Sequence, residues 1–114
     1  MGKDCIFCKI VSKEIPKKII FEDDLIVAFN DIFPVASTHF LIIPKEHTES
    51  VNALTETDKD AKLMGRLVLV AKKIAEEQGI AERGYKLLIR TGKEGGQEVP
   101  HVHLHLMGGE SNLS

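Results

Sequence analysis

Residues 101–107 read HVHLHLM, a strict alternation of histidine with apolar residues. This period of two is typical of a strand with one buried face. Because successive side chains of a strand point to opposite faces, the three histidines share one face and the apolar residues the other. At about 3.3 Å per residue, His101 and His105 would lie about 13 Å apart, too far to bind one zinc ion at ~2.0–2.1 Å. The three imidazoles must therefore serve different purposes, unless the segment is only a half-exposed strand rich in histidine.

The composition predicts one domain over residues 1–114, with 43% hydrophobic and 28% charged residues. A net charge of −2 argues against nucleic-acid binding, which usually needs a basic surface. No apolar run approaches the ~18 residues of a membrane span, and the N-terminal residues lack the pattern of a signal peptide or a myristoylation site. We therefore expect a cytoplasmic protein with reduced thiols and no membrane or nucleic-acid partner.

Cys5 and Cys8 form a C-x-x-C pair in a predicted short helix over residues 5–11, with Asp4 as its expected cap. Three interpretations remain open for this pair. It is a redox pair, although little chain precedes it for the strand that such a pair needs. It is two ordinary buried cysteines. Or it is half of a Cys2His2 zinc site completed by two downstream histidines.

The remaining pattern predicts strands, turns and one long helix. The expected strands are residues 17–21, 25–29, 39–43, 85–89 and 101–107, the first two forming a hairpin through residues 22–24. The helix is expected from Thr57, which can cap it, to Gln78, before Gly79. Gly65 inside this helix costs about 1 kcal/mol relative to alanine. It therefore suggests close approach by a neighbouring backbone, either in the core or from a dimer partner.

Two further segments carry polar groups suited to a ligand. The glycine-rich residues 90–100, RTGKEGGQEVP, can present backbone N–H groups to an anion. Because they lie directly before the histidines, they predict an oxyanion or phosphate pocket. Asp31, at the end of a predicted strand, could accept hydrogen bonds from vicinal hydroxyls. On the residues alone, a turn in which Asp31 bonds its own backbone is the better interpretation.

Residues 4–10, DCIFCKI, and 95–109, GGQEVPHVHLHLMGG, resemble the histidine triad (HIT) family, and the resemblance covers nearly the whole chain. The closing glycine pair is similar to the histidine triad nucleotide-binding branch. The resemblance implies an α+β fold with a five-stranded antiparallel sheet, one long and one short helix. It also implies a homodimer with a continuous ten-stranded sheet.

The same resemblance implies hydrolysis of purine nucleoside 5′-phosphoramidates and adenylates. His103 would be the catalytic nucleophile that forms a nucleotidyl-histidine, which water then cleaves. Its unperturbed pKa of about 6.5 suits a neutral nucleophile. His105 would hydrogen-bond the phosphate or the leaving group. No catalytic metal is implied.

The resemblance also implies binding sets. The base slot is formed by apolar residues: Ile6, Phe7, Ile10, Phe29, Ile32 and Leu41. Asp31 would accept hydrogen bonds from the ribose hydroxyls, so with the resemblance the ligand role is preferred over the turn role. The phosphate end is bound by Arg90, Gly96, Gln97, Glu98, Val99, His103 and His105. A structural Zn²⁺ is held by Cys5, Cys8, His47 and His101, and His39 is a supporting polar group near the site.

Two features depart from the family pattern. Arg90 stands where the family usually has an asparagine that orients the phosphate end, so it either binds the phosphate directly or points away and leaves the site one hydrogen bond short. The chain also ends five residues after Gly109. We therefore expect no specificity from a longer C-terminal tail. Three other functions remain open: a dinucleoside polyphosphate hydrolase, a nucleotide-binding regulator with incidental turnover, and a zinc module that scaffolds other proteins.

Overall fold

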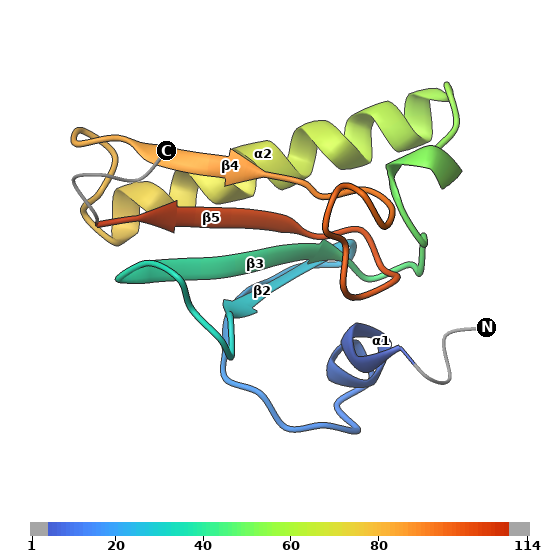
Figure 1. Ribbon diagram of the computed structural model, residues 1–114, viewed down its shortest axis with the longest axis horizontal. Helices are drawn as coiled ribbons and strands as arrows, with labels where there is room; N and C mark the ends of the chain where they lie inside the picture. Colours follow the sequence, from blue (N-terminus) through green and yellow to red (C-terminus); the bar gives the residue numbers. More distant parts are fainter. Residues whose placement is uncertain (1–4, 110–114) are drawn as a thin grey trace.

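A computed structural model describes residues 5–109. It contains a five-stranded antiparallel sheet of order β1-β2-β3-β5-β4 (Figure 1). The elements are α1 (Ile6–Val11), β1 (Ile19–Glu22), β2 (Ile26–Asn30), β3 (Thr38–Pro44), the 3-10 helix η1 (Val51–Ala53), α2 (Asp58–Glu77), β4 (Tyr85–Leu88) and β5 (Leu104–Gly108). The predicted sheet, long helix and short helix are confirmed.

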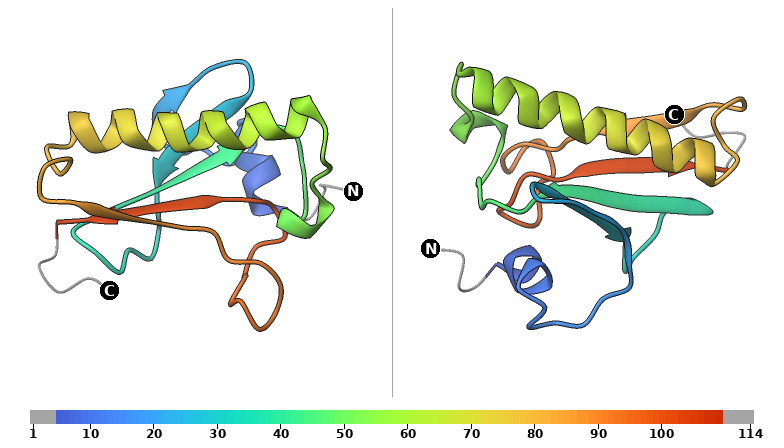
Figure 2. Two further views of the ribbon diagram at one scale, coloured as in Figure 1. Left: turned by 90° about the horizontal axis from the view of Figure 1, so that it is seen from above. Right: turned by 180° about the vertical axis from the view of Figure 1, so that it is seen from behind.

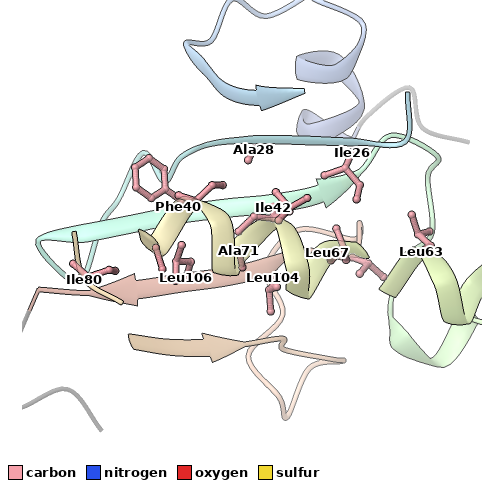
Figure 3. Close-up of a cluster of buried hydrophobic side chains, with 14 residues drawn as sticks. Ile26, Ala28, Phe40, Ile42, Leu63, Leu67, Ala71, Ile80, Leu104 and Leu106 are labelled. Atoms are coloured by element: carbon pink, nitrogen blue, oxygen red, sulfur yellow. The ribbon is translucent and has the colours of Figure 1, made fainter. Parts of the chain in front are cut away.

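The long helix α2 lies across one face of the sheet (Figure 2). The Thr57 hydroxyl accepts the N–H of Asp60 as predicted, and Gly79, at φ +76°, follows the C-terminal turn. The buried stripe of α2 packs on β2, β3 and β5 (Figure 3): Leu63, Leu67, Val70, Ala71, Ile74 and Ala75. Each large apolar side chain buried here contributes about 1.5–3 kcal/mol. None of the helices within residues 5–109 is long and apolar enough to cross a bilayer.

Gly65 does not mark a close approach by any other segment of residues 5–109. A Cβ added at Gly65 would have no atom within 4 Å, and the residue is exposed. The core-packing explanation for this glycine is therefore wrong. The alternative, a contact with a dimer partner, stays a prediction.

The short helix α1 lies on the other side of the sheet from α2 (Figure 1). It packs through Phe7 and Ile10 against Phe29 and Leu41 in a second apolar cluster. The sulfur of Cys5 accepts the N–H of Cys8 at 3.3 Å, so Cys5 is the N-cap of the helix. The expectation that Asp4 caps it is therefore wrong, and Asp4 itself lies outside the described residues.

The hairpin between β1 and β2 forms where predicted, although β1 begins at Ile19 rather than at residue 17. The Asp23 carboxylate closes its turn by accepting the N–H groups of Leu25 and Ile26, both at 2.8 Å. A carboxylate that bonds the backbone two residues ahead is a common turn device. The bonded turn delays β2, which starts at Ile26.

The histidine segment is a strand only in its second half. β5 starts at Leu104, so the prediction of a strand over the whole of residues 101–107 is wrong. The N–H of Val102 donates to the carbonyl of Thr48, and the N–H of His101 to that of Val99, so neither joins the ladder. The predicted division of faces is nevertheless confirmed. Val102, Leu104 and Leu106 belong to the core beneath α2, and the histidines face the other way.

Candidate functional site

A cavity of about 490 Å³ opens on the α1 side of the sheet, between α1, the ends of β2 and β3, and the glycine-rich turn. All but one of the residues predicted to bind nucleotide line it: Ile6, Phe7, Ile10, Phe29, Asp31, Ile32, Leu41, Arg90, Gly96, Glu98, Val99, His103 and His105. Segments far apart in sequence thus meet at one cavity, which is lined by both apolar and polar side chains.

The exception is Gln97, which borders a second, more open cavity. Its side-chain amide donates to the carbonyls of Glu49 and Val99 at 2.7 and 2.9 Å, and its oxygen accepts the N–H of Gly92 at 2.9 Å. The Gln97 side chain therefore holds the glycine-rich turn to the segment after β3. It shapes the main cavity by fixing this turn.

The cavity also contains residues that the sequence did not assign to it: Lys17, Asn30, Phe33, Val35 and Met107. His39, the predicted supporting polar group, lines it as well. Met107 continues the alternation of His103 and His105, so the same period of two could have placed it on this face. His39 pairs with Met107 in the ladder between β3 and β5. Nothing in the local pattern of the loop residues Phe33 and Val35 points to a ligand.

The His103 ring has a fixed tautomer. Its Nδ1 lies 2.6 Å from the carbonyl oxygen of His101, and because a carbonyl only accepts, Nδ1 carries the proton. The lone pair of the ring is therefore on Nε2. The ring is 6% exposed and packs edge-on against Phe7, with centroids 5.0 Å apart. Burial lowers the pKa of His103, so the imidazole is neutral at physiological pH.

His39 links Asp31 to His105. The backbone N–H of Val35 donates to His39 Nδ1 at 3.1 Å, so the proton of the neutral ring is on Nε2. That Nε2 lies 2.9 Å from His105 Nδ1 and 3.2 Å from the Asp31 carboxylate. Burial lowers the pKa of His39, and the nearby Asp31 only partly opposes this. His39, predicted only as a supporting polar group, is thus the hydrogen-bond donor that orients His105.

This orientation leaves one donor of His105 without a protein partner. Because Nδ1 of His105 accepts from His39, the proton of its ring is on Nε2, which is buried and has no partner within residues 5–109. An unpaired buried donor costs about 1–3 kcal/mol. Asp31, His39 and His105 lie close enough together to hold a metal ion. However, the Nε2 of His39 carries a proton and so has no lone pair with which to bind a metal. The arrangement suits an oxygen or nitrogen acceptor of a ligand.

Asp31 forms the predicted turn and also lines the cavity. Its Oδ1 accepts the N–H of Phe33 at 3.0 Å, as in a turn, and its Oδ2 faces His39. A carboxylate has about four acceptor positions. Asp31 lines the cavity with acceptor capacity left for hydroxyl groups.

We expect the pH profile of kcat/KM for substrate hydrolysis to reflect the lowered pKa of the buried His105. Burial, followed by the neighbouring His103 and His39, lowers the pKa of His105 to about 4. A lowered pKa keeps the ring neutral far below its ordinary value of about 6.5. The rate should therefore stay level from pH 8 to pH 6 and fall only below about pH 5. An acid limb centred at pH 6.5 or above, in protein that circular dichroism shows to be folded, would contradict this.

Cys5, Cys8, His47 and His101 come together beside the cavity, with their ligand atoms all within 4.8 Å of one another. Nδ1 of His101 lies 3.3 and 3.5 Å from the sulfurs of Cys5 and Cys8, and Nδ1 of His47 lies 3.2 Å from that of Cys8. In a tetrahedral zinc site, bonds of about 2.3 Å to sulfur and 2.0–2.1 Å to nitrogen place the two atoms about 3.5 Å apart. The four residues therefore fit a zinc ion.

The environment of His101 supports this fit. Its Nε2 donates to the carbonyl of Pro44 at 2.8 Å, which leaves the lone pair on Nδ1, the atom that faces both sulfurs. A backbone carbonyl that fixes the tautomer in this way is a common outer partner of metal-binding histidines. Burial raises the pKa of Cys8 to about 11, whereas a coordinated thiol is deprotonated outright.

The family assignment follows from comparison with known proteins. A family model described as HIT domain matches residues 12–112. The chain belongs to the HIT domain family. It is 50% identical over 109 residues to the purine nucleoside phosphoramidase of Escherichia coli K12, covering 96% of this chain and 90% of that protein.

Solved structures of other HIT proteins are similar to this one. A HIT family hydrolase from Legionella pneumophila has a TM-score of 0.89 at 48% identity, covering 94% of each chain. A histidine triad protein from Clostridium difficile has a TM-score of 0.91 at 40% identity, covering 98% of this chain and 96% of that one. Cys5 and Cys8 precede the residues matched by the HIT family model, so the metal set rests on the geometry described above.

The site of this HIT protein combines three kinds of group. His103 offers a neutral nitrogen lone pair, and His105 offers an oriented N–H donor. The glycine-rich turn and Arg90 add donors at the rim. A fixed nucleophile beside pre-aimed donors can form a covalent intermediate and stabilise the negative charge that develops on its target.

Proposed function

We propose that this chain is a purine nucleoside phosphoramidate hydrolase that acts through a nucleotidyl-His103 intermediate. The observation that carries the proposal is the hydrogen bond from His103 Nδ1 to the carbonyl of His101, which leaves Nε2 unprotonated in a residue that lines the cavity. The likeness to a purine nucleoside phosphoramidase over 96% of the chain supports the substrate class.

The reaction has two steps. His103 Nε2 attacks the α-phosphorus and the P–N bond breaks, so the nucleotide is transferred to the imidazole and the amine departs. Water then breaks the P–N bond to His103 and releases the nucleoside monophosphate. In the first step the leaving nitrogen takes up a proton from solvent, so a neutral amine departs. In the second step the attacking water gives its hydroxyl to the phosphorus and returns a proton to solvent. The free N–H of His105 stabilises the charge on a phosphate oxygen or on the leaving nitrogen.

The nucleoside occupies the apolar part of the cavity. Phe7, Phe29 and Leu41 are buried side chains there and suit the faces of a purine. Asp31 accepts from the ribose hydroxyls with its remaining lone pairs. The backbone N–H groups of residues 96, 98 and 99 bind the non-bridging oxygens.

The zinc ion, held by Cys5, Cys8, His47 and His101, has a structural role in this proposal. Four protein ligands leave no open position on the metal, so it supplies rigidity and no chemistry. It joins α1, which carries Ile6, Phe7 and Ile10 of the base slot, to His101, whose carbonyl fixes the tautomer of His103. We place the enzyme in the cytoplasm, where both thiols stay reduced.

A homodimer completes the proposal, with β4 of two chains pairing to extend the sheet. β4 is an edge strand, and such an edge presents unpaired backbone groups. Its Leu87 is exposed, as are Val68 and Leu69 on α2, one turn from Gly65. These residues give the partner an apolar surface.

Replacing both Leu69 and Leu87 with glutamate is therefore expected to convert a dimer to a monomer. Buried carboxylates would have no partner at the interface. Light scattering coupled to gel filtration measures the mass. Leu25→Glu, in the hairpin turn beside the opposite edge, is the control and should stay dimeric. A wild-type monomer, or a dimer that survives both substitutions, would rule out this interface.

A direct assay separates the proposed activity from dinucleoside polyphosphate hydrolysis. Adenosine 5′-phosphoramidate and a diadenosine polyphosphate are offered to the same preparation, and kcat/KM is measured for each. We expect cleavage of the P–N substrate to be faster by about 100-fold or more, which corresponds to ~2.7 kcal/mol. Faster cleavage of the P–O substrate would favour the alternative, and negligible turnover of both with tight nucleotide binding would favour a regulator.

A further inference from the structure

Arg90 follows β4 and lies across the glycine-rich turn at the rim of the cavity. A Cβ added at Gly96 would lie 3.1 Å from Nη1 of Arg90 and 3.5 Å from its Cδ, and Nη1 lies 3.5 Å from the carbonyl of Gly95. Gly96 has φ +81°, so its backbone also favours glycine. The bare turn therefore gives the Arg90 side chain room to reach the cavity.

The Arg90 guanidinium has no acidic partner in the described part of the chain. None of the salt bridges formed within residues 5–109 involves it, although Glu98 lines the same cavity. Burial is the main cause of the lowered pKa values of His103 and His105, and the positive charge of Arg90 contributes to both. An unpaired cation thus acts on the two imidazoles that face the reacting phosphorus.

Arg90 comes from a different segment of the chain than the groups proposed to bind the nucleoside. The base and ribose groups, Phe7, Phe29 and Asp31, come from α1 and β2 and the residue after it, whereas Arg90, Gly96 and Glu98 belong to the turn. If the nucleoside lies against α1 and the phosphorus faces His103, the leaving group is the part of the substrate left to contact Arg90. Arg90 is exposed, as a residue that meets a leaving group at the cavity mouth must be.

We propose that Arg90 is a specificity-determining residue that binds an anionic group on the departing amine, so that the preferred substrates are nucleoside 5′-phosphoramidates of amino acids with a free carboxylate. The inference rests on the proposed function and specifies its substrate class. The planar guanidinium matches a carboxylate with two parallel hydrogen bonds. A neutral amine leaves this cation without a partner.

The test compares substrates that differ only in one charge. Adenosine 5′-phosphoramidates of tryptophan and of tryptophan methyl ester are offered to wild type, Arg90→Asn, Arg90→Gln and Lys93→Gln. Lys93 is the matched control, because it is a cation of the same turn that borders the second cavity and not the main one. The readout is the ratio of kcat/KM for the acid to that for the ester.

In the wild type and in Lys93→Gln we expect a ratio of about 10 or more, the usual effect of a hydrogen bond to a charged group. In both Arg90 variants it should fall to about 1. Equal losses on both substrates, with the ratio unchanged, would show that Arg90 serves the α-phosphate and would overturn the inference. A wild-type ratio near 1 with brisk turnover would overturn it too while leaving the proposed function intact. No turnover of either substrate by the wild type would instead reject the proposed function.

Discussion

His103→Ala is expected to lower kcat for adenosine 5′-phosphoramidate by about 10⁴-fold or more, the scale on which removal of a nucleophile acts in covalent catalysis. Among the histidines that line the cavity, His103 alone has an unprotonated Nε2 and a bond from Nδ1 to a backbone carbonyl that fixes the ring. His105 cannot replace it, because its own Nε2 carries the proton. Single-turnover and steady-state assays measure the loss.

The same variant should keep its affinity for nucleoside monophosphate within about threefold, since the base slot and Asp31 are untouched. Isothermal titration measures this affinity. Lys93→Ala, a truncation on the neighbouring turn, serves as the control and should retain wild-type kcat. A His103→Ala protein with a tenth or more of the wild-type kcat would contradict the assigned role, and lost binding with a lowered Tm would point to a packing role for the ring.

Cys8→Ala is expected to lose the zinc ion and to lower Tm by roughly 10 °C or more. Structural zinc contributes about 10–16 kcal/mol in small zinc-dependent domains. Here the sheet and α2 form a core of their own, so the loss should be a few kcal/mol, each worth about 4–8 °C in a domain of this size. Elemental analysis and calorimetry, performed under reducing conditions, measure the two effects.

The loss of zinc should also weaken nucleotide binding, because α1 carries one wall of the base slot. Lys9→Ala on the same helix leaves the ligand set intact and is the matched control. A metal-free wild type whose Tm does not respond to a chelator would show that Cys5 and Cys8 are ordinary buried thiols. A disulfide between them under native conditions would support a redox pair instead.

The elements of this fold could be predicted because local signals agree with the packing. The alternation in residues 101–107 places the apolar side chains under α2, and the cap at Thr57 and the stop at Gly79 bound that helix. The start of β5 at Leu104 could not be predicted. The backbone of Val102 bonds Thr48, a long-range partner that no local pattern reveals. The N-cap of α1 was also not predicted, because cysteine is not among the usual N-cap residues.

The lining of the candidate site was predictable where the family pattern assigns residues. It was not predictable where a side chain bonds a partner that only the tertiary fold brings close. Asp31 was weighed as either a turn residue or a ligand acceptor, but its two oxygens allow it to be both. The role of His39 depends on the N–H of Val35, which fixes its tautomer. Gln97 lies within the glycine-rich turn, yet its side chain bonds Glu49 across 48 positions of the chain. Such pairings depend on the tertiary fold.

Mass spectrometry of protein that is mixed with an adenosine phosphoramidate and rapidly quenched tests the nucleophile most directly. We predict an added mass of one adenylyl group, which is AMP less one water, on the peptide that contains His103, formed within the first turnover and absent in His103→Ala. The imidazole–phosphorus bond is labile in acid, so the quench and digestion are kept alkaline. Turnover with no adduct at any time, or an adduct on a peptide without His103, would contradict the proposed mechanism.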